Sequence, residues 1–189
     1  ILTKDSIHDE NMHELVTNKA KEFINKANEK ETPFFMYLSH YLVHGPWKPN
    51  KRFTTNKEWN TRLEKQGDIN PIVYPAMVRE LDWHIGEIVK ELEKLGMTEN
   101  TVIFFTSDNG PWLTNNPDRS AGSAWPLRGS KFNTFEGGHR VPGIVKYPKR
   151  IPSGLISNEL VSSMDIFPTI AHLSGASLPE DKIIDGKNI

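Results

Sequence analysis

Residues 101–110 read TVIFFTSDNG, a short apolar run that ends in small and polar residues. A run of this length and composition is typical of a β-strand buried on both faces of a sheet. The segment before it, from Tyr74 to Leu95, carries apolar residues at helical spacing, and Gly96 follows as a helix-closing glycine would. A helix followed by a buried strand indicates an α/β protein with a largely parallel sheet.

The same order of elements occurs nearer the N-terminus. Residues 12–27 have the spacing of an amphipathic helix, and residues 34–38 (FFMYL) form a second strand-length apolar run. Residues 39–72 are polar and contain three prolines, which predicts a long loop of the kind that often carries function.

The C-terminal part of the sequence predicts one more strand and one more helix. We expect the strand within Val141 to Tyr147, and the helix from about Asp165 to a closing Gly175. Neither an internal repeat nor an obvious linker divides the chain. The length therefore predicts one domain or a large piece of one.

Composition excludes several classes of protein. The 189 residues include 23 Lys and Arg against 24 Asp and Glu, so the net charge of −1 lacks the basic excess of a nucleic-acid binder. No apolar run approaches the roughly 20 residues that a membrane span needs. The absence of cysteine excludes disulfides, zinc–thiolate sites and a thiol nucleophile within these residues. Because the chain begins at Ile1 and not at Met, we expect a processed chain or a fragment.

Asp108 and Asn109 directly follow the central predicted strand. Ligands of open α/β sheets bind at the carboxyl ends of strands, and a carboxylate with an amide oxygen suits Ca²⁺ or Mg²⁺. Calcium takes about 6–8 oxygens, so these two side chains would form only part of a site. An Asp-Asn-Gly sequence after a strand is also common in plain turns, which is the alternative interpretation.

Two further segments have candidate functional residues. His40 and His44 begin the long loop, where a histidine can serve as a general acid, an anion ligand or a surface residue. Residues 127–140 (LRGSKFNTFEGGHR) combine basic groups with glycines and could hold sulfate or phosphate, although the spacing of a phosphate-binding P-loop is absent. A solvated loop is the alternative there.

Taken in order, these segments resemble the sulfatase family. The resemblance extends from about Thr17 to Gly186 and is carried by residues 33–40, 44–46, 106–110, 127–131, 136–142, 162–169 and 185–186. It implies an alkaline-phosphatase-like three-layer α/β/α sandwich, here a partial domain, and hydrolysis of an aryl or carbohydrate sulfate ester. It also implies a bound Ca²⁺, with Mg²⁺ less favoured, and a periplasmic or extracellular location.

The resemblance also assigns roles to four residues. Asp108 and Asn109 match metal ligands of the family, and Lys131 matches the lysine that binds the sulfate oxygens. His44 matches the histidine that contacts the sulfate and protonates the departing alcohol oxygen. The pattern from Glu136 to Arg140 is expected to fix the loop that carries Lys131.

Other parts of the family pattern have no counterpart in this chain. The family's nucleophile is a formylglycine made from Cys or Ser in a short motif that contains an arginine. The chain has no Cys, and residues 120–124 (SAGSA) do not match that motif. The first aspartate pair of the family is also missing. We therefore expect residues 1–189 to be the C-terminal portion of a sulfatase catalytic domain, inactive without its nucleophile-bearing N-terminal half.

Two alternatives remain open from the sequence. A phosphatase or phosphonate monoester hydrolase of the same superfamily would use similar cations on a similar tetrahedral anion. A non-catalytic fragment that kept the fold would need none of this chemistry. The partners expected for the enzyme are small-molecule or saccharide sulfate esters, with no nucleic acid.

Overall fold

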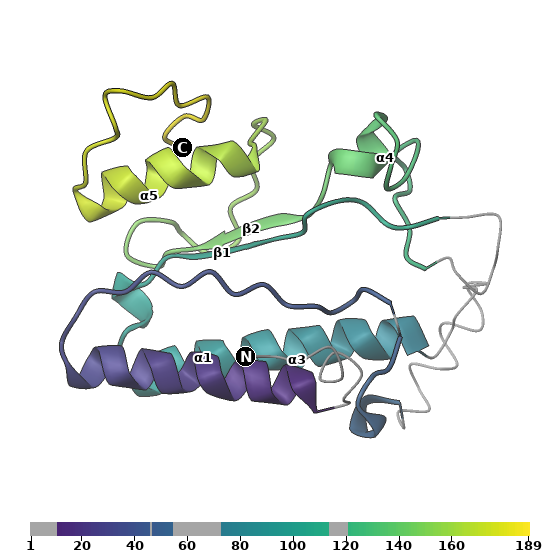
Figure 1. Cartoon of the computed structure of the whole chain (residues 1–189), viewed down its shortest axis with the longest axis horizontal. Coiled ribbons are helices and arrows are strands. Elements are labelled where there is room, and N and C mark those ends of the chain that lie inside the picture. Colours follow the sequence, from purple (N-terminus) through teal and green to yellow (C-terminus); the bar gives the residue numbers. More distant parts are fainter. Residues whose placement is uncertain (1–10, 46, 55–72, 114–120) are drawn as a thin grey trace. The chain divides into compact units, whose positions relative to one another are not determined.

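The computed structural model describes residues 11–45, 47–54, 73–113 and 121–189 (Figure 1). Pro46, residues 55–72 of the predicted loop, and Ser120 of the SAGSA stretch lie outside these ranges. The contacts divide the chain into two compact units, residues 1–152 and residues 153–189. Every helix in the described ranges is too short or too polar to pass through a bilayer.

The elements of the two units follow one another along the chain. The first unit contains α1 (Met12–Glu29), η2 (Lys51–Phe53), α3 (Val73–Lys94), η3 (Thr98–Asn100), β1 (Ile103–Thr106), α4 (Glu136–His139) and β2 (Gly143–Lys146); the second contains η5 (Ser163–Asp165) and α5 (Ile166–Ser174).

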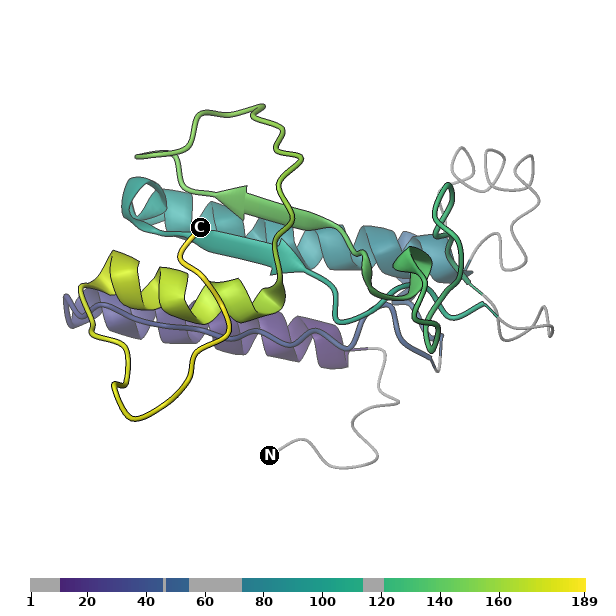
Figure 2. The same cartoon turned by 90° about the horizontal axis from the view of Figure 1, so that it is seen from above.

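Helices α1 and α3 lie side by side and form the core of the first unit (Figures 1 and 2). Their buried apolar residues are Ala20 and Ile24 on α1, and Ile88 and Leu92 on α3. The predicted helices are confirmed, with ends within two residues of those expected. Gly96 closes α3 at a φ of +68°, and the N–H of Met97 donates to Leu92 O at 2.9 Å, as in a Schellman motif.

The buried faces of both helices are more polar than the sequence predicts. On α1, His13 and Thr17 are buried, whereas Leu15 and Phe23 are exposed. On α3, Glu80 and His84 are buried between the two helices. Most of the apolar residues expected on the buried faces are buried or partly buried, and Leu15 and Phe23 are the exceptions on α1. Polar side chains share these faces because they are paired with one another.

Strands β1 and β2 pair antiparallel, with Ile103 opposite Lys146 and Thr106 opposite Gly143. Both strands lie within the segments predicted as strands. Their direction corrects the expectation of a largely parallel sheet for this pair. The connection between them covers residues 107–142, which is long enough to permit either direction.

Residues 34–38 were predicted as a strand, and the structure corrects this. They run as an unpaired extended trace alongside α1 (Figures 1 and 2). Burial alternates as it does in a strand: Phe34, Met36 and Leu38 pack against the core, and Phe35 and Tyr37 are exposed. A strand requires a hydrogen-bonded neighbour, and no backbone bond from these residues is found within the described ranges.

The second unit is built around α5. Ser162 and Asp165 form a capping box before it: Ser162 Oγ accepts from Met164 N at 3.3 Å, and Asp165 Oδ2 accepts from Ser162 N at 2.7 Å. Gly175, at a φ of +75°, ends the helix as predicted. The other oxygen of Asp165 accepts the N–H of Lys187 at 2.7 Å, which ties the C-terminal segment to the start of α5.

Candidate active site

The turn after β1 presents oxygen atoms to solvent. Ser107 Oγ donates to Asn109 O at 3.1 Å, and Asn109 Nδ2 donates to Gly110 O at 2.9 Å. Asp108 is exposed, and within the described ranges its carboxylate accepts only a 3.5 Å contact from Ser107 Oγ. Because Asn109 uses its NH₂ group for the turn, its Oδ1 and the Asp108 carboxylate keep lone pairs for a hard cation.

Backbone hydrogen bonds join this turn to the loop that carries Lys131. The N–H of Gly110 donates to Gly138 O at 2.9 Å, and the N–H of Lys131 donates to Pro111 O at 2.9 Å. Gly110 is buried, and a Cβ at this position would overlap Gly137 O. The close approach therefore requires glycine here, and it brings Asp108, Asn109 and Lys131 to the same end of β1.

The glycines of residues 136–140 hold the loop in shape. The N–H of Gly137 donates to Arg128 O at 2.8 Å, and a Cβ on Gly137 or Gly138 would overlap a backbone carbonyl of residues 128–133. Ser130 N donates to Asn133 Oδ1 at 2.9 Å, which closes the turn that contains Lys131. The expectation that this pattern fixes the Lys131 loop is confirmed.

Lys131 itself has an available charge. Within the described ranges no carboxylate lies at ion-pair distance from its ammonium group. Its Nζ lies 5.5 Å from the centroid of the Phe132 ring. Phe132 has a φ of +72°, a left-handed conformation that costs a non-glycine residue roughly 1–2 kcal/mol. Its side chain is exposed next to Lys131.

His44 is exposed on a loop of its own. The ring atom Nδ1 of His44 lies 2.8 Å from Gly45 O. The backbone N–H of His44 donates to Tyr41 O at 2.9 Å. A carbonyl can only accept, so this contact assigns a proton to Nδ1 and leaves Nε2 as the free ring nitrogen. The hydroxyl of Tyr41 also donates to Gly45 O at 2.8 Å, which supports the same turn.

Backbone hydrogen bonds join the segments that carry three of the four predicted site residues. Asp108, Asn109 and Lys131 lie on segments joined by the two backbone bonds above, whereas no hydrogen bond in the described ranges links His44 to any of them. The segment from residue 40 to 45 and α4 nevertheless lie toward the same end of the first unit, to the right of the end of β1 in Figures 1 and 2.

A buried polar cluster lies beneath the His44 loop. We call His13, His40, Glu80, His84 and Thr17 the histidine cluster. The ring centroids of His40 and His84 are 5.6 Å apart, and that of His13 is 6.2 Å from His40 and 6.3 Å from His84. Burial lowers the pKa of His40 to about 4, aided by the neighbouring His84 and His13, so its ring is neutral near pH 7.

Sequence reasoning assigned no function to His13 or His84. A usable signal was present, because His13 and Thr17 are four residues apart on α1, and Glu80 and His84 are four apart on α3. Both pairs continue the stripe of core residues on their helix, so polar groups at these positions had to pack against each other.

The described residues would supply only part of the predicted metal site. No group of three or more His, Asp or Glu side chains among them is arranged to bind a metal ion. Asp108 and Asn109 fit a hard cation in their donor chemistry but supply two oxygens where calcium takes about 6–8. The remaining ligands would come from other residues or from water.

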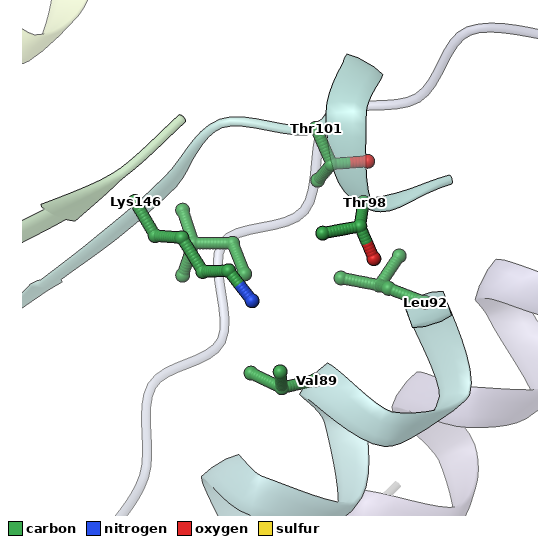
Figure 3. Close-up of a pocket in the computed structure, with 6 residues that line it drawn as sticks. Val89, Leu92, Thr98, Thr101 and Lys146 are labelled. Carbon is green, nitrogen blue, oxygen red and sulfur yellow. The ribbon is translucent and has the colours of Figure 1, made fainter. Parts of the chain in front are cut away.

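A small pocket away from these residues has no bearing on the site. It lies between the C-terminal end of α3 and the two strands, and Lys146 reaches across it (Figure 3). The ammonium group of Lys146 is 3.6 Å from Glu93 Oε1. The pocket is too small to hold a water molecule, so we treat it as a packing feature.

Comparison with known proteins identifies related enzymes. The family described as Sulfatase matches residues 3–176. The chain is 37% identical over 183 residues to steryl-sulfatase of Homo sapiens, covering 95% of this chain and 29% of that protein. It is 37% identical over 186 residues to N-acetylgalactosamine-6-O-sulfatase of Bacteroides thetaiotaomicron, covering 95% of this chain and 34% of that protein.

Solved structures agree with the sequence relatives. Ps i-CgsB, crystallised in complex with k-i-k-neocarrahexaose, matches with a TM-score of 0.78 and 32% identity, over 94% of this chain and 37% of that one. The PsFucS1 sulfatase from Pseudoalteromonas sp. matches with a TM-score of 0.77 and 34% identity, over 93% of this chain and 33% of that one. The chain thus spans about a third of the length of these relatives.

Proposed function

Because this chain belongs to the sulfatase family, we propose that the complete protein hydrolyses sulfate esters and that residues 1–189 are the C-terminal portion of its catalytic domain. The observation that carries the proposal is the pair of backbone bonds, Gly110 to Gly138 and Lys131 to Pro111. They join an oxygen-rich strand end, suited to a cation, to a loop with an available ammonium group. A sulfate ester needs both, since charge builds up on its oxygens during cleavage.

Lys131 would hold the sulfate oxygens. Its loop is fixed by the packing of Gly137 and Gly138, so the ammonium group starts from a defined backbone position. A preorganised cation stabilises the developing negative charge with little reorganisation during the reaction.

His44 would protonate the leaving alcohol oxygen. Its Nδ1 is held by Gly45 O, which directs the other ring nitrogen toward solvent. When the ring carries a second proton on Nε2, it becomes a general acid for the alkoxide that forms as the ester bond breaks.

Family membership implies a metal cofactor and a formylglycine. Asp108 and Asn109 would hold the metal, with Ca²⁺ favoured over Mg²⁺, and the formylglycine would come from residues outside 1–189. When bound, the metal supplies further positive charge at the anion, and the formylglycine supplies the nucleophile. The substrate would be an aryl or carbohydrate sulfate ester, and the location periplasmic or extracellular.

The proposal is tested by comparing aryl esters on the complete protein. We expect hydrolysis of 4-nitrophenyl sulfate with a kcat/KM well above that for 4-nitrophenyl phosphate at the same calcium concentration. A preference for the phosphate would indicate the related phosphatase chemistry, and no turnover of either ester would contradict an enzymatic role.

A further inference from the structure

The loop that carries His44 is held at both of its ends by α3. At its start, the ring of His40 packs against the ring of His84, with 5.6 Å between centroids and 31° between planes. At its end, the N–H of Asn50 donates to Glu80 Oε2 at 2.9 Å. Glu80 and His84 are 1% and 0% exposed, and they are four residues apart on one face of the helix.

We propose that Glu80 is a positioning residue for His44, acting with His84 as a clamp that fixes His40 and Asn50, on either side of His44, against α3. The proposal rests on the function proposed above for His44. Glu80 and His84 do not contact the predicted site residues themselves, so their effect would pass through the loop backbone.

Hydrogen bonds within the cluster orient the ring of His84. Thr17 Oγ1 donates its proton to His13 O at 3.0 Å, so in its 2.8 Å contact with His84 Nδ1 the hydroxyl oxygen must accept. His84 Nδ1 therefore carries a proton, and His84 Nε2 faces Glu80 Oε1 at 3.6 Å. Within the described ranges His84 Nε2 is buried and has no hydrogen-bond partner.

Glu80 thus has two separate tasks. One oxygen faces His84, whose ring packs on His40 at the start of the loop, and the other accepts from Asn50 at its end. Further contacts hold the same region: Leu42 is buried, and Arg79 Nη1 donates to Phe53 O at 3.0 Å. His44 is four residues from His40 and six from Asn50 in the sequence, so a shift at either residue would move the backbone that carries the His44 ring. A misplacement of about 1 Å at a catalytic group can lower a rate about 100-fold.

The first test uses variants of Glu80 in the complete protein. Glu80→Ala removes both contacts, whereas Glu80→Gln keeps an acceptor for Asn50 N–H and offers an N–H to His84 Nε2. Glu93→Ala, an exposed carboxylate on the same helix, is the control. Two measurements are made on each variant: amide hydrogen exchange of residues 41–50, and kcat and KM for 4-nitrophenyl sulfate.

We expect Glu80→Ala to speed exchange of residues 41–50 by about tenfold or more, and to lower kcat by about 10–100-fold with KM within about threefold. Glu80→Gln is expected to restore both properties to within about threefold of the unmodified protein. Exchange in Glu80→Ala equal to that in Glu93→Ala would overturn the proposal. Equal kinetic losses in Glu80→Gln and Glu80→Ala would also overturn it.

A second pair of variants keeps the test valid if Glu80→Ala does not fold. Asn50 has a φ of −61°, which proline adopts, so Asn50→Pro removes only the N–H that Glu80 accepts and the side-chain cap on Arg52 N. Asn50→Ala removes the cap alone and is the matched control. Faster exchange of residues 41–45 in Asn50→Pro than in Asn50→Ala supports the clamp, and equal exchange overturns it.

The exchange measurement also separates this proposal from the proposed function. If the complete protein lacks sulfatase activity, or if His44→Ala has no effect on kcat, the function assigned to His44 fails. The clamp is then still decided by exchange in the variants of Glu80 and Asn50.

Discussion

Lys131 is the single side chain whose charge matters most to the proposed reaction. Its backbone N–H is fixed on Pro111 O, and its ammonium group has no carboxylate partner in the described ranges. We expect Lys131→Ala in the complete protein to lower kcat/KM for an aryl sulfate by about 10²–10³-fold, the loss seen when a preorganised charge-stabilising donor is removed.

Lys149→Ala provides the control for this prediction, because Lys149 is exposed and lies beyond the end of β2. Its kcat/KM should stay within about twofold of the unmodified protein. Losses of equal size in the two variants would show that the anion site had been assigned to the wrong lysine.

His40 should make stability depend on pH. Its pKa is lowered from 6.5 in the unfolded chain to about 4 in the folded one, chiefly by burial, with His84 and His13 adding to the effect and Glu80 opposing it. Between these values the unfolded state binds a proton that the folded state does not. The stability contribution that depends on His40 is therefore fully present above about pH 6.5. As the pH falls toward 4, the free energy of unfolding decreases by about 3 kcal/mol in total.

Replacing His40 by Phe tests this dependence. The ring is kept and the titrating group is removed, so the unfolding midpoint of His40→Phe should fall less between pH 7 and pH 4.5 than that of the unmodified protein. His172→Phe, on α5, is the control and should retain the full dependence. A pH dependence of equal size in all three proteins would mean that His40 titrates as it does in the unfolded chain.

At the scale of the element, α5 depends on the carboxylate that precedes it. Hydrogen bonds from the N–H groups of Lys187 and Ser162 lower the pKa of Asp165. Because the pKa of Asp165 is lower in the folded state, these hydrogen bonds stabilise the folded unit at pH values above the unfolded pKa of about 3.8. This stabilisation is lost as the pH falls through the lower pKa of the folded state.

Asp165→Ala should therefore loosen the second unit at neutral pH. We expect faster amide exchange in residues 163–174 and in the segment around Lys187, because two N–H groups lose their acceptor. Asp181→Ala, an exposed carboxylate in the same unit, should leave exchange unchanged. Unchanged exchange in Asp165→Ala would show that the capping box contributes little to α5.

The elements also show which features a sequence can predict. Helices α1, α3 and α5 follow from local signals, namely apolar spacing, a capping carboxylate before α5 and glycines after α3 and α5. The partner of residues 34–38 and the direction of β1 and β2 do not, because strand pairing depends on residues far away in the sequence. The histidine cluster was missed because polar side chains were assigned to the solvent face, whereas the pairs Thr17–His84 and Glu80–His84 are buried.

Within the candidate site, the sequence predicted the segments better than their contacts. Asp108, Asn109 and Lys131 were assigned by resemblance, and the structure adds the glycine contacts at Gly110 and Gly137 that bring them together. These contacts were not predictable from spacing, since residues 108 and 131 are far apart in the sequence. The assignment of His44 to the same site stays a prediction.

For the whole molecule, the coverage of relatives leads to a prediction about residues 1–189 alone. The chain spans about a third of the length of the related sulfatases, and the proposed ligands Asp108 and Asn109 would supply only two oxygens for a cation. We expect the isolated chain to show no turnover of 4-nitrophenyl sulfate and only weak calcium binding by titration calorimetry. Measurable ester hydrolysis by this chain would contradict the prediction.

The most direct test of a single sulfate site is a crystal structure of the complete protein with Ca²⁺ and inorganic sulfate. We predict that Asp108 and Asn109 bind the Ca²⁺, and that Lys131 Nζ and His44 Nε2 both lie within hydrogen-bond distance of one sulfate beside it. A structure in which these side chains open onto separate surfaces, with no anion between them, would contradict this account.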